Sequence, residues 1–423
     1  MHFDYLTYLF QKVWAGILAL AVALSFVLPA KELQLEASHE KDRTNYTYVF
    51  VHGFFGWGEE HKAYQTLPYW GFFNGDMMKA FRAEGYDCAA VTIAPFGSIW
   101  DRVCELYAQL VGARVDYGKA HSEACGHDRF GKDYTGKALL KRWDSKHKIN
   151  LIGHSLGGPT STMLATMLAD GVKAEIDATT DGTLSDLFKG GKPDWIYSVT
   201  GLAAVFNGSS LPVCAQAVQD TGDYLSGRLD SRKWIGPGTR LMLKQTIRGV
   251  VKTMKKVASG EVADPDTAIY DMDPDHMAQI NKTQIRTLDN VYYFSVPHDG
   301  TMPDEKDGHL VADKKNDDFV FTLLMPVLGR TNTTTKGGIV MDTSWGPNDG
   351  LANTISETAP FTAPQEKVAF QPSPALAGTF ATGKYYIFPT YHGAHLVLEG
   401  NVFRPNPEGP AYVLRIMEMI NAI

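Results

Sequence analysis

The strongest chemical signal in the chain is a serine with one glycine two residues before it and another two residues after it. Ser155 lies in the pentapeptide Gly-His-Ser-Leu-Gly, which follows an apolar segment at residues 148–152 and precedes a helical pattern. A strand, a tight turn and a helix in this order form a nucleophile elbow, whose strained backbone presents the serine hydroxyl. Both glycines are needed, because a Cβ atom at either position would collide with the neighbouring strand or helix. The alternative is an ordinary glycine-rich turn.

A serine nucleophile requires a general base and an acid that orients the base, and after an elbow they occur in the order serine, acid, histidine. His395 follows a strand candidate near the C-terminus, where the last loop of the sheet would return to the elbow. His392 is a close rival, and His298 is a distant one. Asp349, in an Asn-Asp-Gly turn, is a candidate for the acid, although an aspartate in such a turn often does no more than shape it.

Two backbone N–H groups are expected to stabilise the oxyanion that forms when a serine attacks a carbonyl. The first is the N–H of Leu156, because the elbow directs the start of the following helix toward the reacting carbonyl. The second is the N–H of Phe54, in the turn that follows an early strand. Together these residues predict acyl transfer through a covalent serine intermediate.

Alternating strands and helices must position these residues. From about residue 46, short β-branched or aromatic segments alternate with helical patterns, which indicates βαβ units and a mostly parallel sheet. The strand candidates are residues 45–51, 88–93, 149–152, 195–200, 291–296 and 385–388. The helix candidates are residues 77–84, 99–110, 160–168 and a C-terminal helix from about residue 411. Without an internal repeat or a long linker, the sequence favours a single α/β domain over residues 45–423.

The composition argues against several other classes of protein. Of the 423 residues, 44% are hydrophobic and 21% are charged, so a packed core is expected rather than a disordered chain. The formal net charge of -7 gives no electrostatic reason to bind a polyanion, and no nucleic-acid partner is expected. The four cysteines are too few for a disulfide scaffold and too irregularly spaced for a Cys-x-x-Cys motif.

The N-terminus differs from the rest of the chain. Residues 13–30 contain no charged side chain, and a helix of this length, at about 1.5 Å per residue, just crosses the apolar core of a bilayer. Residues 1–30 are therefore interpreted as a cleaved secretory signal peptide or as an uncleaved membrane anchor. Either interpretation predicts an exported protein, which is secreted or tethered to the outer face of a membrane by residues 13–30.

Several motifs resemble the secreted lipases of staphylococci and thermophilic bacilli. They occur at residues 51–58, 69–71, 100–112 and 115–118, of which Trp-Asp-Arg-Val-Cys-Glu-Leu-Tyr-Ala-Gln-Leu-Val-Gly is the longest. The family's W-x-x-N-D-G motif for the catalytic acid is matched by residues 345–350, and its T-Y-x-x-x-H-L motif by residues 390–396. The resemblance selects Asp349 and His395 over their rivals. It implies an α/β-hydrolase with a helical lid and activity as a triacylglycerol lipase or carboxylesterase.

A metal site is also implied by this resemblance. From the residues alone, His121 and His127 would be surface histidines, because their spacing of six cannot place both on one face of a helix. The bacillus-type lipases bind a structural zinc ion through two histidines and two aspartates, and the corresponding positions are Asp101, His121, His127 and Asp266. Such a closed set of ligands would fasten an insertion and take no part in the reaction. Cys125, between the two histidines, is an additional soft ligand.

The family's calcium ligand is not matched. It falls two residues after the catalytic histidine, where this chain has Val397. Glu399 is close in sequence but out of phase, so calcium is left out of the prediction.

An amphipathic helix is predicted at residues 239–258. Its apolar residues recur at spacings of three and four, and its basic residues recur every four positions on another face. It is either a surface helix docked on the core or part of a lid that opens at a lipid surface. The resemblance favours the lid, because the family's lid and insertion would fall within about residues 205–265.

The sequence therefore predicts an exported serine hydrolase that cleaves lipid esters at a lipid–water interface or membrane surface. Two alternatives stay open. The first is a non-catalytic, membrane-tethered lipid-binding protein on a hydrolase fold, and the second is an amidase or peptidase on the same scaffold.

Overall fold

The computed structural model describes residues 33–35, 46–214, 265–305, 308–313, 315, 319–401 and 405–423. The apolar segment at residues 13–30 and the amphipathic helix at residues 239–258 lie outside these ranges, as does most of the insertion expected at residues 205–265. Within the described ranges, no helix combines the length and the apolar character needed to cross a bilayer. The division into domains and the lid stay predictions.

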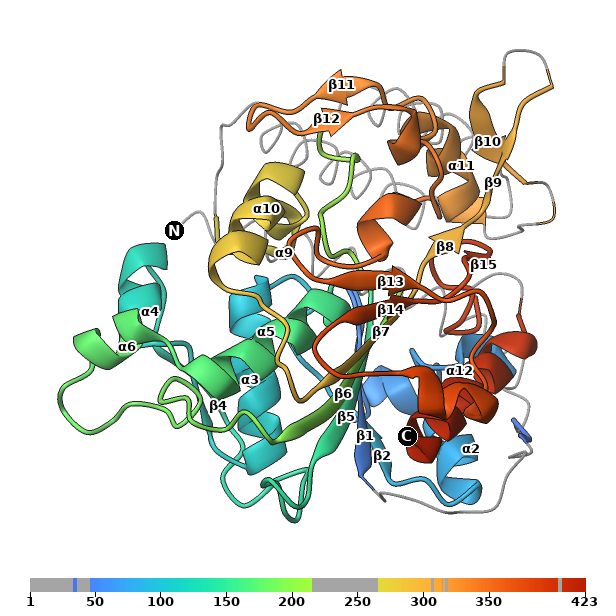
Figure 1. Cartoon of the computed structure of the whole chain (residues 1–423). Helices are drawn as coiled ribbons and strands as arrows, with labels where there is room; N and C mark the ends of the chain where they lie inside the picture. The colour runs from blue at the N-terminus through green and yellow to red at the C-terminus, as the bar shows by residue number, and fades with distance from the viewer. Residues whose placement is uncertain are drawn as a thin grey trace, which may run out of the picture.

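A seven-stranded sheet forms the centre of the structure (Figure 1). Its strands run in the order β13-β14-β7-β6-β5-β1-β2, and every neighbouring pair is parallel. The strands are β1 (Thr47–Val51), β2 (Cys88–Ala90), β5 (Ile149–His154), β6 (Ile196–Leu202), β7 (Tyr292–Val296), β13 (Gln365–Lys367) and β14 (Tyr385–Ile387). The predicted parallel α/β sheet is confirmed. Strand β13 was not predicted, because this exposed, polar edge strand has no apolar pattern.

Helices cover both faces of the sheet (Figure 1). One layer contains α3 (Ile99–Val111) and α5 (Gly157–Asp170). The other layer contains α2 (Met77–Ala83) and α12 (Glu408–Ala422). Val49 and Val51 of β1 belong to the core shared with α3 and α5. Tyr48 and Phe50 belong to the core shared with α2 and α12. This alternation explains why the strand is apolar throughout, since both faces of a covered parallel sheet are buried.

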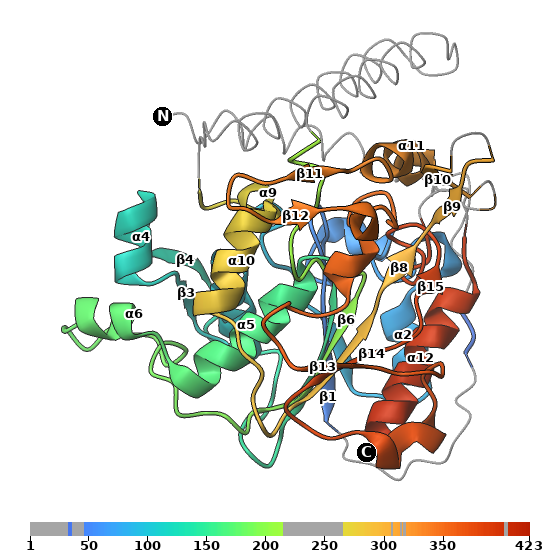
Figure 2. The same ribbon diagram turned by 45° about the horizontal axis from the view of Figure 1, so that its top comes forward.

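Shorter elements surround one end of the sheet. Figure 2 shows α9, α11 and the β11–β12 hairpin at the top of the view, above the central strands. These outer elements are α9 (Ala268–Asp271), α10 (Pro274–Thr283), α11 (Phe319–Leu328), β8 (His298–Asp299) paired with β15 (Tyr391–His392), β9 (Thr301–Pro303) with β10 (Leu310–Ala312), and β11 (Thr333–Thr334) with β12 (Val340–Met341). Several of them follow the carboxyl ends of β7 and β14, the edge at which parallel sheets bind ligands.

A second group of small elements projects from the side of the molecule (Figure 1). It consists of the antiparallel strands β3 (Arg114–Asp116) and β4 (Phe130–Asp133), with the helices α4 (Lys119–Cys125) and α6 (Lys173–Ala178). None of these four elements was predicted, since each is too short to show a periodic pattern.

Candidate active site

Ser155 lies in a tight turn between a strand and a helix. Strand β5 ends at His154 and helix α5 begins at Gly157, so Ser155 occupies the turn between them. Its φ angle is 56°, in the left-handed region that residues with a side chain rarely adopt. A Cβ on Gly153 would collide with the backbone oxygen of Gly157, and a Cβ on Gly157 would collide with the oxygen of Val51. Both flanking glycines therefore make the close approaches that the sequence predicts.

His395 and Asp349 are hydrogen-bonded to each other beside this turn. Nδ1 of His395 bonds to Oδ2 of Asp349, and the backbone N–H of His395 donates to the backbone oxygen of Asp349 at 3.0 Å. The His395 ring lies 4.6 Å, centroid to centroid, from the ring of His154, which precedes Ser155. Oγ of Ser155 and Nε2 of His395 are both buried, and neither has a hydrogen-bond partner among the described residues. The fold thus gathers Ser155, His395 and Asp349 from distant parts of the chain.

Asp349 is a fully buried carboxylate that accepts several hydrogen bonds. Its Oδ1 accepts the N–H groups of Leu351 and Ala352 at 2.9 and 2.8 Å. Burial alone would raise the pKa of Asp349, but the charge of His395 and the hydrogen bonds to the carboxylate outweigh burial and lower that pKa. Asp349 is therefore an anion at neutral pH, as an acid that orients a histidine must be.

The two rival histidines lie in different environments. His392 is exposed, and its Nε2 lies 3.0 Å from Oδ2 of Asp313. His298 is fully buried in β8, and burial lowers the pKa of its ring to about 3, so the ring is neutral. The backbone N–H of His298 donates to the carboxyl group of Glu357 at 2.6 Å.

The turn that carries Phe54 lies against Ser155. Gly53 approaches the serine so closely that a Cβ on this glycine would lie 2.5 Å from Cβ of Ser155. The N–H of Gly56 donates to the oxygen of Gly53 at 3.1 Å and closes the turn. Within the described part of the chain, no acceptor is found for the N–H of Phe54 or for that of Leu156. Both groups are available to an anionic ligand.

Helix α3 supports this turn through side chains whose role was not predicted. Arg102 is fully buried, and its guanidinium donates to the backbone oxygens of His52 and, at 2.7 Å, of Ala94. Gln109 bonds to both the N–H and the oxygen of Thr92, at 3.1 and 2.6 Å. A charged residue on the apolar face of a helix could have revealed this role from the sequence. An arginine is buried only when other groups pair with it, so Arg102 had to have partners. These contacts account for part of the long motif at residues 100–112.

A buried polar network links the Phe54 turn with His154 and His395. The hydroxyl of Tyr69 lies 2.5 Å from Nδ1 of His154 and accepts the N–H of Gly53 at 3.3 Å. Nε2 of His154 lies 3.0 Å from the backbone oxygen of His395. Oε2 of Glu399 lies 3.5 Å from the same nitrogen, and burial raises the pKa of this glutamate well above its usual value. Glu399 is therefore a neutral acid in this network.

A second polar cluster lies beside α4. Nε2 of His121 lies 3.3 Å from Oδ1 of Asp101 and 3.3 Å from Oδ1 of Asp266. Nε2 of His127 lies 3.1 Å from Oδ2 of Asp266. Helix α4 ends at Cys125 and is capped by Gly126 in the left-handed conformation, and this turn brings His127 back beside His121. The four residues selected by the resemblance therefore lie together.

Three donor-to-donor distances in this cluster match the spacing expected around one metal ion. Donor atoms at 2.0–2.1 Å from a tetrahedral ion would be about 3.3–3.4 Å apart, close to the 3.1 and 3.3 Å observed. Oδ1 of Asp101 and Nε2 of both histidines are buried without a hydrogen-bond partner among the described residues. The four side chains whose donor atoms all lie within 4.8 Å of one another are His121, Cys125, His127 and Asp266, and Cys125 is not in a disulfide. Asp101 is not in that set, although its Oδ1 lies 3.3 Å from Nε2 of His121. The residues can therefore hold a metal ion.

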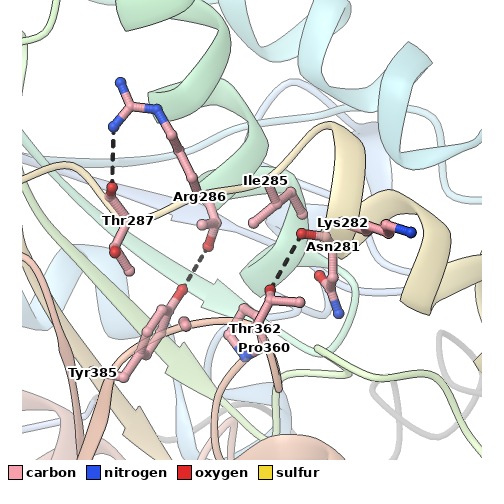
Figure 3. A pocket seen from close by; sticks show the side chains of 10 residues that line it. Asn281, Lys282, Ile285, Arg286, Thr287, Pro360, Thr362 and Tyr385 are labelled. Carbon is pink, nitrogen blue, oxygen red and sulfur yellow. Dashed lines mark hydrogen bonds between the residues drawn. The ribbon is translucent and has the colours of Figure 1, made fainter.

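A cavity of about 270 Å³ lies apart from both clusters (Figure 3). Its wall includes Asn281, Arg286 and Thr362, and the hydroxyl of Tyr385 bonds to that of Thr162 at 2.8 Å. Arg286 is already paired with a carboxylate of α5 at 2.6 Å. None of the lining residues belongs to the Ser155 site or to the metal cluster, so the cavity has no part in the chemistry described below.

Comparison with known sequences establishes the family. Residues 44–389 match the family described as lipase-like, C-terminal domain. The chain belongs to this lipase-like family. A lipase of Staphylococcus hyicus is 32% identical over 334 residues, which cover 76% of this chain and 49% of the relative. Lipase 1 of Staphylococcus aureus, strain MRSA252, is 30% identical over 324 residues, which cover 74% of this chain and 45% of the relative. This lipase-like chain spans about half the length of these curated relatives.

Solved structures share the fold of the lipase-like chain. EstA from Clostridium botulinum has a TM-score of 0.71 and 27% identity, and the match covers 94% of each chain. The Staphylococcus hyicus lipase has a TM-score of 0.67 and 25% identity, covering 90% of this chain and 98% of that one. Lipase 1 from Pelosinus fermentans has a TM-score of 0.68 and 26% identity, covering 88% and 98%. The predicted α/β-hydrolase fold is confirmed.

Proposed function

We propose that this chain is a serine hydrolase of lipid esters in which Ser155, His395 and Asp349 are the catalytic residues. One observation carries the proposal. An elbow serine is held at positive φ, and the ring of His154, which precedes it, packs against a histidine whose Nδ1 bonds to a buried aspartate. The named lipases among its relatives support a lipid ester as the substrate.

In the proposed reaction, Nε2 of His395 removes the proton of Ser155 as Oγ attacks the ester carbonyl carbon. Asp349 holds Nδ1–H of the imidazole and stabilises the imidazolium that forms. The imidazolium then gives its proton to the leaving alcohol, and the acyl group stays on Ser155. Water, deprotonated by His395, attacks this acyl-enzyme and releases the fatty acid. A hydrogen bond between Oγ of Ser155 and Nε2 of His395 is expected to form when an ester binds, because catalytic hydrogen bonds are often long or poorly aligned in the free enzyme.

The N–H groups of Phe54 and Leu156 are proposed to bind the oxyanion. Each N–H group belongs to one of the two tight turns that lie against each other at Ser155. Removing one such donor typically lowers kcat about 10²–10³-fold. The rings of Phe54, Phe55 and Phe96 pack together beside the turn, with centroids 4.2–5.6 Å apart, and all three are partly buried. Such an aromatic surface suits an apolar acyl chain.

The metal cluster is proposed to hold one structural zinc ion through Asp101, His121, His127 and Asp266. Two imidazoles and two carboxylates fill a tetrahedron, so the ion would fasten α4 and the segment before α9 to helix α3. The side chains of the Ser155 site are separate from this set, and the reaction needs no metal ligand from it. Zinc is favoured over calcium because the donor set contains two imidazoles.

Export and action at a lipid surface are also part of the proposal, and the apolar segment at residues 13–30 and the resemblance to secreted lipases support them. Residues 13–30 would direct export or tether the protein, and residues 239–258 would belong to a lid. Ser155 is only 1% exposed, so a bulky ester requires an opening movement before it reaches the nucleophile.

The decisive experiment assays acyl esters from short to long with the wild type and with Ser155→Ala. Ester hydrolysis that is abolished in Ser155→Ala, together with labelling of Ser155 by a serine-directed phosphonate, is the expected result. Turnover of amides but not of p-nitrophenyl esters would indicate an amidase or peptidase instead. Lipid binding without turnover or labelling would indicate the non-catalytic alternative.

A further inference from the structure

A second carboxyl group lies buried beside Asp349. Glu357, the last residue of the 3-10 helix η4 (Thr354–Glu357), is 0% exposed. Its Oε2 accepts the backbone N–H of His298 at 2.6 Å. Within the described part of the chain, no N–H or hydroxyl group donates to its Oε1. A polar atom of Glu357 lies within 4.8 Å of polar atoms of both Asp349 and His395.

Asp349 and Glu357 are both fully buried and have carboxyl oxygens no more than 4.8 Å apart, so ionisation of one carboxyl group strongly opposes ionisation of the other. Asp349 accepts hydrogen bonds from His395 and from two backbone N–H groups, whereas Glu357 accepts one. The negative charge is therefore more stable on Asp349, and the proton belongs on Glu357. In agreement, burial and the charge of Asp349 raise the pKa of Glu357 well above its usual value.

We propose that Glu357 is a positioning residue that, as a neutral acid, donates a hydrogen bond to Asp349 and so holds the aspartate that orients His395. This inference rests on the proposed function of the Ser155 site. Glu357 does not touch the substrate and acts only through Asp349. The sequence did not reveal this role of Glu357. The two carboxyl groups come close only because the turn after Asp349 and the 3-10 helix η4 fold the chain back on itself.

The groups around Glu357 favour its neutral form. Asp349 faces it from the preceding turn, and His298 and Asp299 face it from β8. The ring of His298 is neutral, and the fourth neighbour, His395, is bound to Asp349. The largest influences on the pKa of Glu357 are burial and the charge of Asp349, and both raise it. Ionisation at alkaline pH would thus place a second negative charge against Asp349 and break the hydrogen bond.

The test compares wild type, Glu357→Gln and Glu357→Leu, with Glu366→Gln on the exposed strand β13 as a control. Glutamine can accept the N–H of His298 and still donate to Asp349, at any pH. We therefore expect Glu357→Gln to keep kcat within about threefold of the wild type at pH 7. Glu357→Leu removes a hydrogen bond to a charged group and should lower kcat about 10- to 100-fold with little change in KM.

The pH profile separates positioning from packing. The wild type and Glu366→Gln should lose kcat at alkaline pH as Glu357 ionises, whereas Glu357→Gln should lack this decline. Equal losses in the glutamine and leucine variants, or the same alkaline decline in Glu357→Gln as in the wild type, would overturn the proposal.

A stability measurement tests the shared proton without any substrate. The unfolded chain releases the proton of Glu357 above about pH 4.3, while the folded chain keeps it, so folding becomes less favourable as pH rises. The unfolding constant of the wild type relative to Glu357→Gln should therefore increase by up to about tenfold per pH unit between pH 5 and the pKa of the folded protein. A ratio independent of pH would refute the shared proton. If the wild type hydrolyses no ester, the proposed function fails, and this ratio alone decides about Glu357.

Discussion

Ser155→Gly should be more stable than Ser155→Ala, and both variants should be inactive. Ser155 is held at φ 56° by the strand and helix on either side of it. An L-residue in this region costs about 1–2 kcal/mol relative to right-handed backbone, whereas glycine adopts it freely. Activity is lost in Ser155→Gly and in Ser155→Ala alike, so stability can be compared between two inactive proteins.

The expected magnitude follows from two opposing effects. Glycine relieves the strain of about 1–2 kcal/mol. Its greater freedom in the unfolded chain offsets about 0.4–1 kcal/mol of that gain. Ser155→Gly should therefore be more stable than Ser155→Ala by roughly 0.5–1 kcal/mol. Both variants also remove a buried hydroxyl that has no hydrogen-bond partner among the described residues, so this contribution cancels in the comparison.

Ser161 provides a matched control. It is buried in the same helix, α5, in right-handed backbone, and its hydroxyl donates to the oxygen of Gly157 at 2.7 Å. At this position alanine should be more stable than glycine by about 1 kcal/mol, the ordinary preference of a helix interior. The difference in the free energy of unfolding between the alanine and glycine variants should thus have opposite signs at Ser155 and Ser161.

Urea unfolding followed by tryptophan fluorescence measures the free energy of unfolding of the four variants, with metal at saturation and pH held constant. Midpoints are compared only if the slopes agree, since a changed slope indicates a changed unfolded or native state. A Ser155→Ala protein at least as stable as Ser155→Gly, alongside a normal Ser161 pair, would show that the elbow is not strained and would refute the reasoning.

Three further predictions concern the histidine, the metal and the lipid surface. His395→Ala should eliminate hydrolysis and His392→Ala should retain it; the reverse result would move the catalytic base. The purified protein should contain about one zinc ion per chain, and chelation should lower the melting temperature more than the initial rate at low temperature; absence of zinc, or unchanged melting in Asp266→Ala with His127→Ala, would contradict this. Activity on an insoluble ester should rise sharply once droplets form. Changing Lys244, Arg248 and Lys252 to glutamine should weaken binding to anionic vesicles by about 1 kcal/mol per charge. Hyperbolic kinetics through the solubility limit, with unaltered vesicle binding, would contradict a lid at residues 239–258.

The central strands were predictable because each is an apolar or β-branched segment between turn residues. Strands β1, β2, β5, β6, β7 and β14 overlap the predicted segments, with boundaries differing by a few residues. The missed elements include the ten-residue helices α10 and α11 as well as short or exposed elements: β13 is a polar edge strand, and β3, β4, α4 and α6 make up a small projection. Short elements of this kind are stabilised mainly by contacts with the rest of the fold, and local pattern carries little information about them.

The environment of Asp349 was beyond the reach of sequence reasoning. Its motif indicated an acid, but the burial of Glu357 and the neutral His298 beside it depend on how β8 and η4 pack together. The same holds for Arg102, whose partners are carbonyl groups of segments before and after β2. Charged side chains are stabilised in a core only by specific partners, and those partners are distant in sequence.

The nucleophile elbow is encoded locally, because a strand, two glycines and a helix start within a few residues dictate the backbone of Ser155. The proposed base and acid are not encoded locally: His395 and Asp349 come to the elbow only because parallel strands bring their carboxyl ends to one edge of the sheet. The metal cluster depends likewise on the fold, which brings Asp266 to His121 and His127. Backbone conformation depends on neighbours along the chain, whereas the distance between two side chains and the state of a shared proton depend on packing and burial, which exist only in the folded molecule.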